Sequence, residues 1–111
     1  MSKKYELVMG QFIKVGTRKL YRIKALRDFS DVKIGDIGGY IEKEDNLSHE
    51  GNCWVYGDAR VYGNAKVYGN AWVSGNAQVY GNAWVSGNAR VYGNARVYGN
   101  AWVSGNEEVY K

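Results

Sequence analysis

Proline is absent from the 111-residue chain, and cysteine and histidine occur once each. The single cysteine, Cys53, excludes an intrachain disulfide, and the single histidine, His49, excludes a three-histidine zinc site. No apolar run approaches the roughly 18 residues needed to cross a bilayer, and the N-terminus lacks the apolar core of a secretory signal. These absences predict a cytoplasmic protein without membrane association, metal or cofactor.

Leucine and phenylalanine are also scarce, which argues against a helical core packed with leucine. The chain has a single threonine, Thr17, whereas an ice-binding face would be expected to carry regular rows of threonine. No GxxxxGK[ST] loop is present to hold a phosphate. What the chain has in abundance is glycine, with 15 residues, and tyrosine, with 10.

The net charge of +4 is unevenly distributed. Residues 1–36 carry nine Lys/Arg against four Asp/Glu, whereas residues 37–54 carry one against four. A basic N-terminal segment can attract nucleic acid or another acidic partner. Lysines that only keep a small domain soluble are the other explanation.

A six-residue period begins at Val55. The hexads read VYGDAR, VYGNAK, VYGNAW, VSGNAQ, VYGNAW, VSGNAR, VYGNAR, VYGNAW and VSGNEE, which makes nine units over residues 55–108. In Ala-X-Val-Tyr, strand alternation points alanine and valine to one side and the other two residues to the opposite side. Gly-Asn then turns the chain, because glycine adopts positive φ without strain and asparagine tolerates the left-handed region.

Three such sides close one coil of eighteen residues. The pattern resembles the hexapeptide repeat of left-handed parallel β-helices and predicts an all-β solenoid. A meander of hairpins is the alternative, but it would leave the valine face uncovered. The prediction requires Val61, Val79 and Val97 to lie one above another.

Residues 37–54 fit the same period less well and predict a degenerate first coil. The period places Ile37 in the valine position, with Ile41, Leu47 and Cys53 in the alanine position, and His49 inward or in a distorted corner. With residues 55–108 this gives about four coils. Because a coil is stable only when stacked on others, residues 1–36 are predicted to form an N-terminal β-hairpin cap on a β-helix of residues 37–111. Glu107 and Glu108 would blunt the far edge.

Eighteen-residue stacking predicts three outward faces rich in aromatic residues. Rows of Tyr with Arg could stack on bases or sugar rings, and rows of Trp could form a protein interface. Each predicted strand pairs a bulky ring with a small or non-aromatic neighbour, Trp54/Tyr56 excepted. The predicted partner-binding residues are Trp72, Trp84, Trp102, Tyr62, Tyr80, Tyr98, Arg60 and Arg96.

Many left-handed β-helix proteins are acyltransferases, and some are zinc carbonic anhydrases. The acyltransferases generally use a histidine base between subunits, and only His49 could play that part here. Cys53 is predicted to be buried and hence a poor nucleophile. The sequence therefore predicts a protein that is not an enzyme and has no catalytic residues.

A closer resemblance covers nearly the whole chain. The motifs "LYRIKALRDF", "GDIGGYIEKEDNLS" and "GNCWV", followed by GNA-type hexads, are similar to those of small phage and prophage hexapeptide-repeat proteins. That family is called YdcK-like transferases or polymer-forming cytoskeletal proteins. The resemblance implies an accessory or counter-defence protein of phage origin that occludes a host factor in the host cytoplasm.

Three functions are therefore open. The preferred one is a non-catalytic binding protein with a host protein as its partner, which also forms homo-oligomers through its aromatic faces or its C-terminal edge. The second is a small acyltransferase-like enzyme with His49 as base. The third is a nucleic-acid or nucleotide binder that uses the basic hairpin and the Arg/Tyr face.

Overall fold

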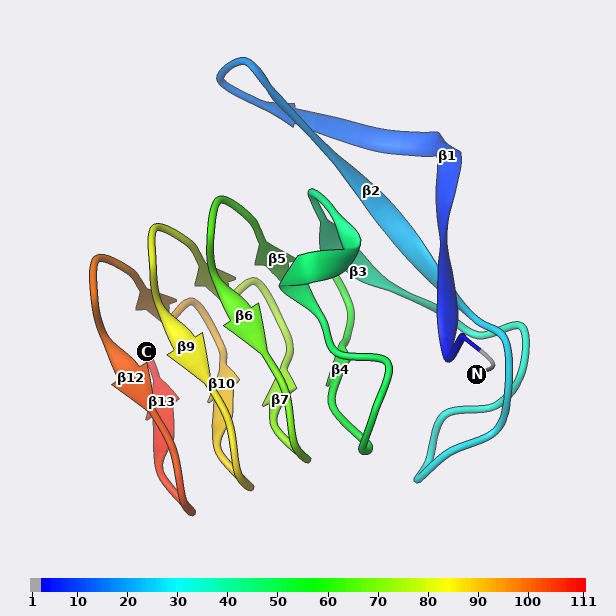
Figure 1. Ribbon diagram of the computed structural model, residues 1–111. Coiled ribbons are helices and arrows are strands. Elements are labelled where there is room, and N and C mark those ends of the chain that lie inside the picture. The colour runs from blue at the N-terminus through cyan, green and yellow to red at the C-terminus, as the bar shows by residue number, and fades with distance from the viewer. Residues whose placement is uncertain (1–2) are drawn as a thin grey trace.

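The computed structural model describes residues 3–111, and its regular secondary structure is β-strand except for one short 3₁₀ turn (Figure 1). Two long strands and a third, shorter one come first and are followed by one 3₁₀ turn, η1. Ten very short strands complete the described chain. The elements are β1 (Tyr5–Val15), β2 (Arg18–Ala25), β3 (Ile37–Ile41), η1 (Glu44–Asn46), β4 (Trp54–Val55), β5 (Arg60–Val61), β6 (Lys66–Val67), β7 (Trp72–Val73), β8 (Gln78–Val79), β9 (Trp84–Val85), β10 (Arg90–Tyr92), β11 (Arg96–Val97), β12 (Trp102–Val103) and β13 (Glu108–Tyr110).

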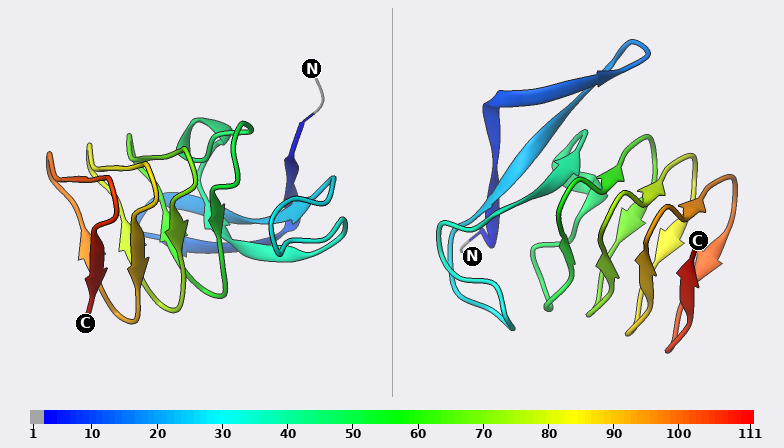
Figure 2. Two further views of the ribbon diagram at one scale, coloured as in Figure 1. Left: turned by 90° about the horizontal axis from the view of Figure 1, so that it is seen from below. Right: turned by 180° about the vertical axis from the view of Figure 1, so that it is seen from behind.

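The short strands form the three sides of a rod, which we call walls A, B and C. Wall A consists of β3, β5, β8 and β11 and is extended by β2 and β1 into one sheet. Wall B consists of β6, β9 and β12, and wall C of β4, β7, β10 and β13. Strands within a wall are parallel from coil to coil (Figure 2). The predicted fold, an all-β, left-handed parallel β-helix of about four coils, is confirmed.

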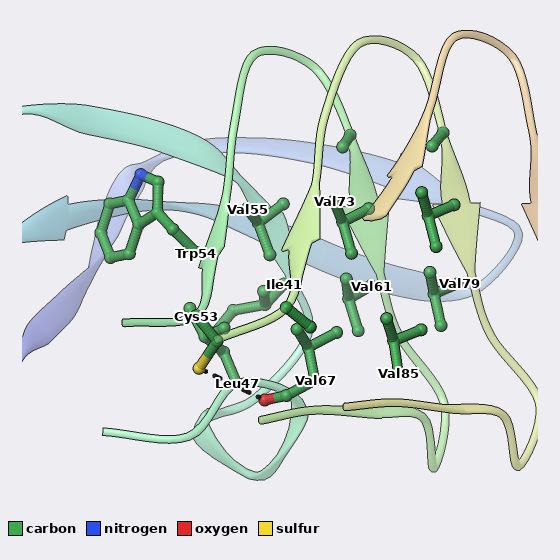
Figure 3. Close-up of a cluster of buried hydrophobic side chains, with 14 of the residues drawn as sticks. Ile41, Leu47, Cys53, Trp54, Val55, Val61, Val67, Val73, Val79 and Val85 are labelled. Atoms are coloured by element: carbon green, nitrogen blue, oxygen red, sulfur yellow. Dashed lines mark hydrogen bonds between the residues drawn. The ribbon is translucent and has the colours of Figure 1, made fainter. Parts of the chain in front are cut away.

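The interior is a narrow column of small apolar side chains. Val61 pairs with Val79, and Val79 with Val97, so the three valines are stacked as predicted. Val61 and Val79 are fully buried, as are most of the alanines of the repeat. Figure 3 shows the valines converging from the walls. Burying one such side chain contributes about 1.5–3 kcal/mol.

Neighbouring coils are joined by backbone hydrogen bonds on the walls and at the corners. On wall A the Arg60 and Tyr62 N–H groups donate to the carbonyls of Ala77 and Val79 at 2.9 and 3.0 Å. At a corner, the Asn82 N–H donates to the Gly99 carbonyl at 2.8 Å. This corner bond brings each glycine close to the glycine of the next coil.

That close approach predicts different effects for two equivalent glycines. Gly87 and Gly105 have φ of +65° and +60°, but a Cβ on Gly87 would lie 2.9 Å from the Gly105 nitrogen, whereas one on Gly105 would meet nothing within 4 Å. Alanine at either site strains the backbone by about 1–2 kcal/mol. We expect Gly87→Ala to lower the free energy of unfolding by about 1–3 kcal/mol more than Gly105→Ala does. At Gly87 the added Cβ must also push the two neighbouring coils apart. Urea unfolding of both variants measures the difference, and equal losses would show that corner contact does not limit side-chain size.

The register predicted for the first coil is wrong. Ile41 lies beside Val61 and Leu47 beside Val67, in valine positions rather than alanine positions. Ile37 is 47% exposed and pairs with Lys24 of the hairpin. The cause is β3, which pairs with β2 on one edge and with β5 on the other. The corner before Cys53 takes up two extra residues, and from Cys53 onward the predicted register holds.

The N-terminal segment covers one end of the rod. Strands β1 and β2 form an antiparallel hairpin, and β2 continues into wall A through β3. On wall C, Trp54 is only 2% exposed, because Tyr5 and Phe29 pack against its indole at ring centroid distances of 6.2 and 5.2 Å. The sequence pattern placed Trp54 on an outer face without the cover that this segment supplies.

Candidate functional site

Wall A carries a column of stacked tyrosines beside a column of long polar side chains. The rings of Tyr62 and Tyr80 lie 5.1 Å apart at an interplanar angle of 6°, and those of Tyr80 and Tyr98 lie 5.4 Å apart at 11°. The strand register places Arg60, Gln78 and Arg96 in the second column. Within residues 3–111, neither Arg60 nor Arg96 has an acidic partner within 4 Å.

Two shallow hollows lie along wall A. One, of about 680 Å³, is lined by Tyr80, Asn94, Arg96, Tyr98 and Lys111. The other, of about 360 Å³, brings Ile13 of the hairpin together with Tyr40, Asp58, Arg60, Asn76 and Gln78. The hairpin therefore contributes to the surface next to Arg60 as well as covering the end of the rod.

The stacking determines what an aromatic column offers a ligand. Where the rings are stacked, as in Tyr62–Tyr80–Tyr98, Trp84–Trp102 and Tyr92–Tyr110, a molecule that approaches from outside meets ring edges. The pairs Tyr56–Trp72 and Tyr68–Trp84 meet edge to face instead. The last rings of the stacks, Tyr98, Trp102 and Tyr110, are 59, 68 and 67% exposed. Bases or sugar rings have no room to stack between successive rings of these stacks, and binding of a ligand to the aromatic walls stays a prediction.

Wall B has a ridge and a trough. The ridge is a column of three side chains, Lys66, Trp84 and Trp102. The rings of Trp84 and Trp102 are stacked, with centroids 5.1 Å apart and an interplanar angle of 1°. The strand direction puts Ser86 and Ser104 beside the two tryptophans, and Tyr68 beside Lys66. The ridge also borders a hollow of about 560 Å³ that is shared with three asparagines of the preceding corner: Asn64, Asn82 and Asn100.

Both corners that flank wall B carry hydrogen-bonded amide ladders. At the first corner the Asn64 amide donates to Asn82, and Asn82 to Asn100, at 3.2 and 3.5 Å. At the second, Asn70, Asn88 and Asn106 are linked in the same way. These ladders hold the edges of wall B in register with its strands.

Wall C is more heterogeneous than the other two walls. The Arg90 guanidinium lies 4.8 Å from the centre of the Trp72 ring, and Tyr56 packs against the same indole at 5.5 Å. Tyr92 stacks on Tyr110 and donates to Glu108. The predicted contact residues thus lie on three walls: Trp72 on C, Trp84 and Trp102 on B, and the tyrosines with Arg60 and Arg96 on A.

The lone histidine lies outside the coil in a corner covered by the N-terminal segment. His49 Nδ1 accepts from the Lys4 backbone N–H at 3.1 Å, and Nε2 lies 2.8 Å from Glu44 Oε1. Its ring stacks on Tyr5 at 4.1 Å and 13°. Both ring nitrogens are thus engaged within the chain. Sequence reasoning missed Lys4, Tyr5 and Glu44, because these contacts join distant parts of the chain.

A buried amine and a buried thiol lie next to this histidine. Lys4 Nζ donates to the Cys53 carbonyl at 2.7 Å and lies 3.4 Å from Cys53 Sγ. Burial lowers the pKa of Lys4 and raises that of Cys53, although the pair partly offset each other. Hydrogen bonds from His49 and Lys3 lower the pKa of Glu44. Cys53 is fully buried, as the period predicted, and raising its pKa keeps the thiol protonated and unreactive.

Residues 3–111 contain no group of three His, Cys, Asp or Glu side chains arranged to bind a metal ion. In the same range, no helix has both the length and the hydropathy needed to span a membrane.

The repeat region matches a known family. Residues 59–75, 65–79, 77–91 and 89–105 each match the family described as YdcK beta solenoid repeat. Over 44 residues the chain is 50% identical to the uncharacterized acetyltransferase YdcK of Escherichia coli (strain K12). The matched segment covers 37% of this chain and 14% of that relative. The predicted likeness to YdcK-type hexapeptide-repeat proteins is therefore confirmed, whereas the phage context is not part of these matches.

The prediction that the chain is not an enzyme is contradicted by this comparison, because the relative bears the name of an acetyltransferase. The prediction rested on His49 being alone. A count of histidines says nothing about acyl transfer that uses other groups, or residues of a second polypeptide.

Proposed function

We propose that the chain, whose residues 59–105 match the family described as YdcK beta solenoid repeat, is a β-solenoid binding module. Its wall A holds an acidic surface of a partner protein. The observation that carries the proposal is the pair of guanidinium groups on Arg60 and Arg96, which have no acidic partner among the described residues. They lie two coils apart, roughly 10 Å, and the tyrosine column runs beside them.

The physical argument is one of preorganisation. Each tyrosine of wall A is held by its stacked neighbour, so little side-chain entropy is lost when a partner covers it. Arg and Tyr are enriched among the residues that dominate binding energy. A guanidinium can bind a carboxylate through two parallel hydrogen bonds. The hairpin adds further positive charge, because Lys14 and Lys19 lie near its turn, where Arg18 is paired with Glu42.

The proposal makes wall A the binding surface, and matched variants test it. We expect Arg60→Ala combined with Arg96→Ala to weaken binding of a polyglutamate peptide at least tenfold in calorimetric titration, since two unpaired charges are removed. Arg90→Ala combined with Lys66→Ala removes two charges from walls C and B and should change the affinity less than twofold. Equal losses in the two variants would mean that net charge, and not wall A, attracts the peptide.

Nucleic acid is the competing ligand for the same charges. A single-stranded oligonucleotide serves as the second titrant, and its binding should weaken steeply as salt is raised if phosphates are the main contact. If the oligonucleotide binds more tightly than polyglutamate at physiological salt, the partner of wall A is nucleic acid and not an acidic protein surface. The phage origin and the host-defence target implied by the sequence resemblance stay predictions.

Acyl transfer is the second candidate, and the name of the relative favours it. It predicts that the chain releases coenzyme A from acetyl-CoA in the presence of an acceptor amine. If His49 is the base, His49→Gln should lower that rate at least a hundredfold. A rate that His49→Gln leaves unchanged would assign the chemistry to another group.

A further inference from the structure

Wall B differs from the other two walls in the sizes of the side chains in its two outward columns. Its column that begins with Lys66 ends in two stacked indoles, whereas the neighbouring column carries serine beside each indole. On wall A both columns are filled, because Tyr62, Tyr80 and Tyr98 stand next to the polar column. Wall B therefore presents a ridge with a parallel trough two residues further along each strand, about 7 Å away.

We propose that wall B is a self-association surface in which a second copy of this chain places its ridge in the trough. A two-fold axis parallel to the rod, between the two columns, brings each residue of the first column opposite its neighbour in the second column of the partner copy. Trp84 and Trp102 then face the serines of the partner copy, and Lys66 faces its tyrosine, equivalent to Tyr68.

Every row of this arrangement is matched in size or charge. Two rows set a large indole against a small hydroxyl. The third sets an ammonium against an aromatic ring, which is an attractive pairing. Lys66 never faces its own copy, so no like charges meet. The contact is isologous, because the same patch serves both copies, and it closes after two.

Rigidity and exposure favour the same wall. The amide ladders on both flanking corners fix its edges, and Trp102 is 68% exposed. Figure 1 shows β6, β9 and β12 side by side with the hairpin leaving the rod elsewhere. An exposed indole that is already ordered loses little entropy when it is covered.

The size of the wall sets the strength of the contact. Three strands spaced about 4.8 Å apart, each four residues long, make a face of roughly 14 by 13 Å. This area is well below that of a standard interface. We therefore expect a reversible dimer with a dissociation constant on the order of 100 µM.

Filling the trough tests the fit directly. Ser86→Tyr combined with Ser104→Tyr keeps the ridge and adds apolar area, and tyrosine already occupies this position in other hexads. Sedimentation equilibrium up to about 1 mM chain should show a dissociation constant raised at least tenfold, so that the variant is mostly monomeric at about 100 µM, where the parent chain is partly dimeric. Ser74→Tyr on wall C is the matched control and should leave the dimer unchanged.

Two outcomes would overturn the proposal: a parent chain that stays monomeric to about 1 mM, or a trough-filled variant that associates as strongly as the parent. The second result would mean that the tryptophans associate through general apolar contact. Arg60→Ala with Arg96→Ala should leave the dimer unchanged. A loss of peptide binding without loss of the dimer, or the reverse, therefore separates this surface from the function proposed for wall A.

Discussion

Val79→Asp should prevent the coils from stacking. Val79 is fully buried on β8, between Val61 and Val97 of the neighbouring coils. The substitution removes about 1.5–3 kcal/mol of apolar burial and places an unpaired carboxylate in the column, which costs several kcal/mol more. That loss is comparable with the whole stability of a domain of this size, on the order of 5–15 kcal/mol. We expect circular dichroism at room temperature to show loss of the β-sheet signal.

Gln78→Asp is the control for this prediction. It introduces the same side chain one position earlier on the same strand, where the residue points outward and is only partly buried. Gln78→Asp should lower the free energy of unfolding by less than about 1 kcal/mol. If both variants melt at the temperature of the parent chain, the valine column does not hold the rod together.

Asn46→Asp should cause the second large loss of stability, although it only replaces the Nδ2 amide group with an oxygen. Asn46 is fully buried at the first-coil corner, where its Oδ1 accepts from the N–H groups of Glu42 and Lys43 at 3.1 and 2.9 Å. Its Nδ2 donates to the carbonyls of Gly63 and Ala65 at 3.2 and 2.9 Å. A carboxylate keeps the two accepted bonds, but it turns an oxygen toward both carbonyls.

We expect Asn46→Asp to lower the free energy of unfolding by about 2–4 kcal/mol, since two buried acceptors lose their donor and face negative charge. The deficit relative to the parent chain should shrink as pH falls toward about 4, because protonating the introduced carboxyl removes that charge. Urea unfolding at several pH values measures it. Asn100→Asp is the control, because Asn100 is exposed and only accepts a hydrogen bond, from Asn82. A deficit of the same size in both variants would exclude the buried network as its cause.

The repeat could be predicted because each of its positions has one environment. Valine and alanine face inward and glycine turns the corner in every coil, so the pattern fixes residues 55–108 without tertiary information. The first coil could not be placed from its pattern, because β3 belongs to two structures. Gly38 and Gly39 are required there, since a Cβ on them would lie 2.5 and 2.6 Å from the carbonyl oxygens of Val55 and Ala59. The six-residue period gives no indication of that contact.

The walls were predictable in composition and less so in shape. Eighteen-residue spacing correctly placed Tyr62, Tyr80 and Tyr98 on one wall, yet it did not reveal that their rings lie face to face. The environment of His49 depends on Lys4, which is 45 positions earlier in the chain. Contacts of that range leave no trace in a local pattern, and they decide whether a histidine nitrogen is available for chemistry.

In a three-sided rod, the effect of a deletion depends on whether it removes a whole number of coils. Removing eighteen residues from the repeat would shorten the rod and leave every downstream side chain on its own wall. Removing six would keep each hexad intact, but it would rotate everything downstream by one side. Trp102 would then leave the ridge of wall B and join the tyrosines of wall A. Two deletions that look equally conservative in an alignment of hexads therefore differ completely in what they do to the surface.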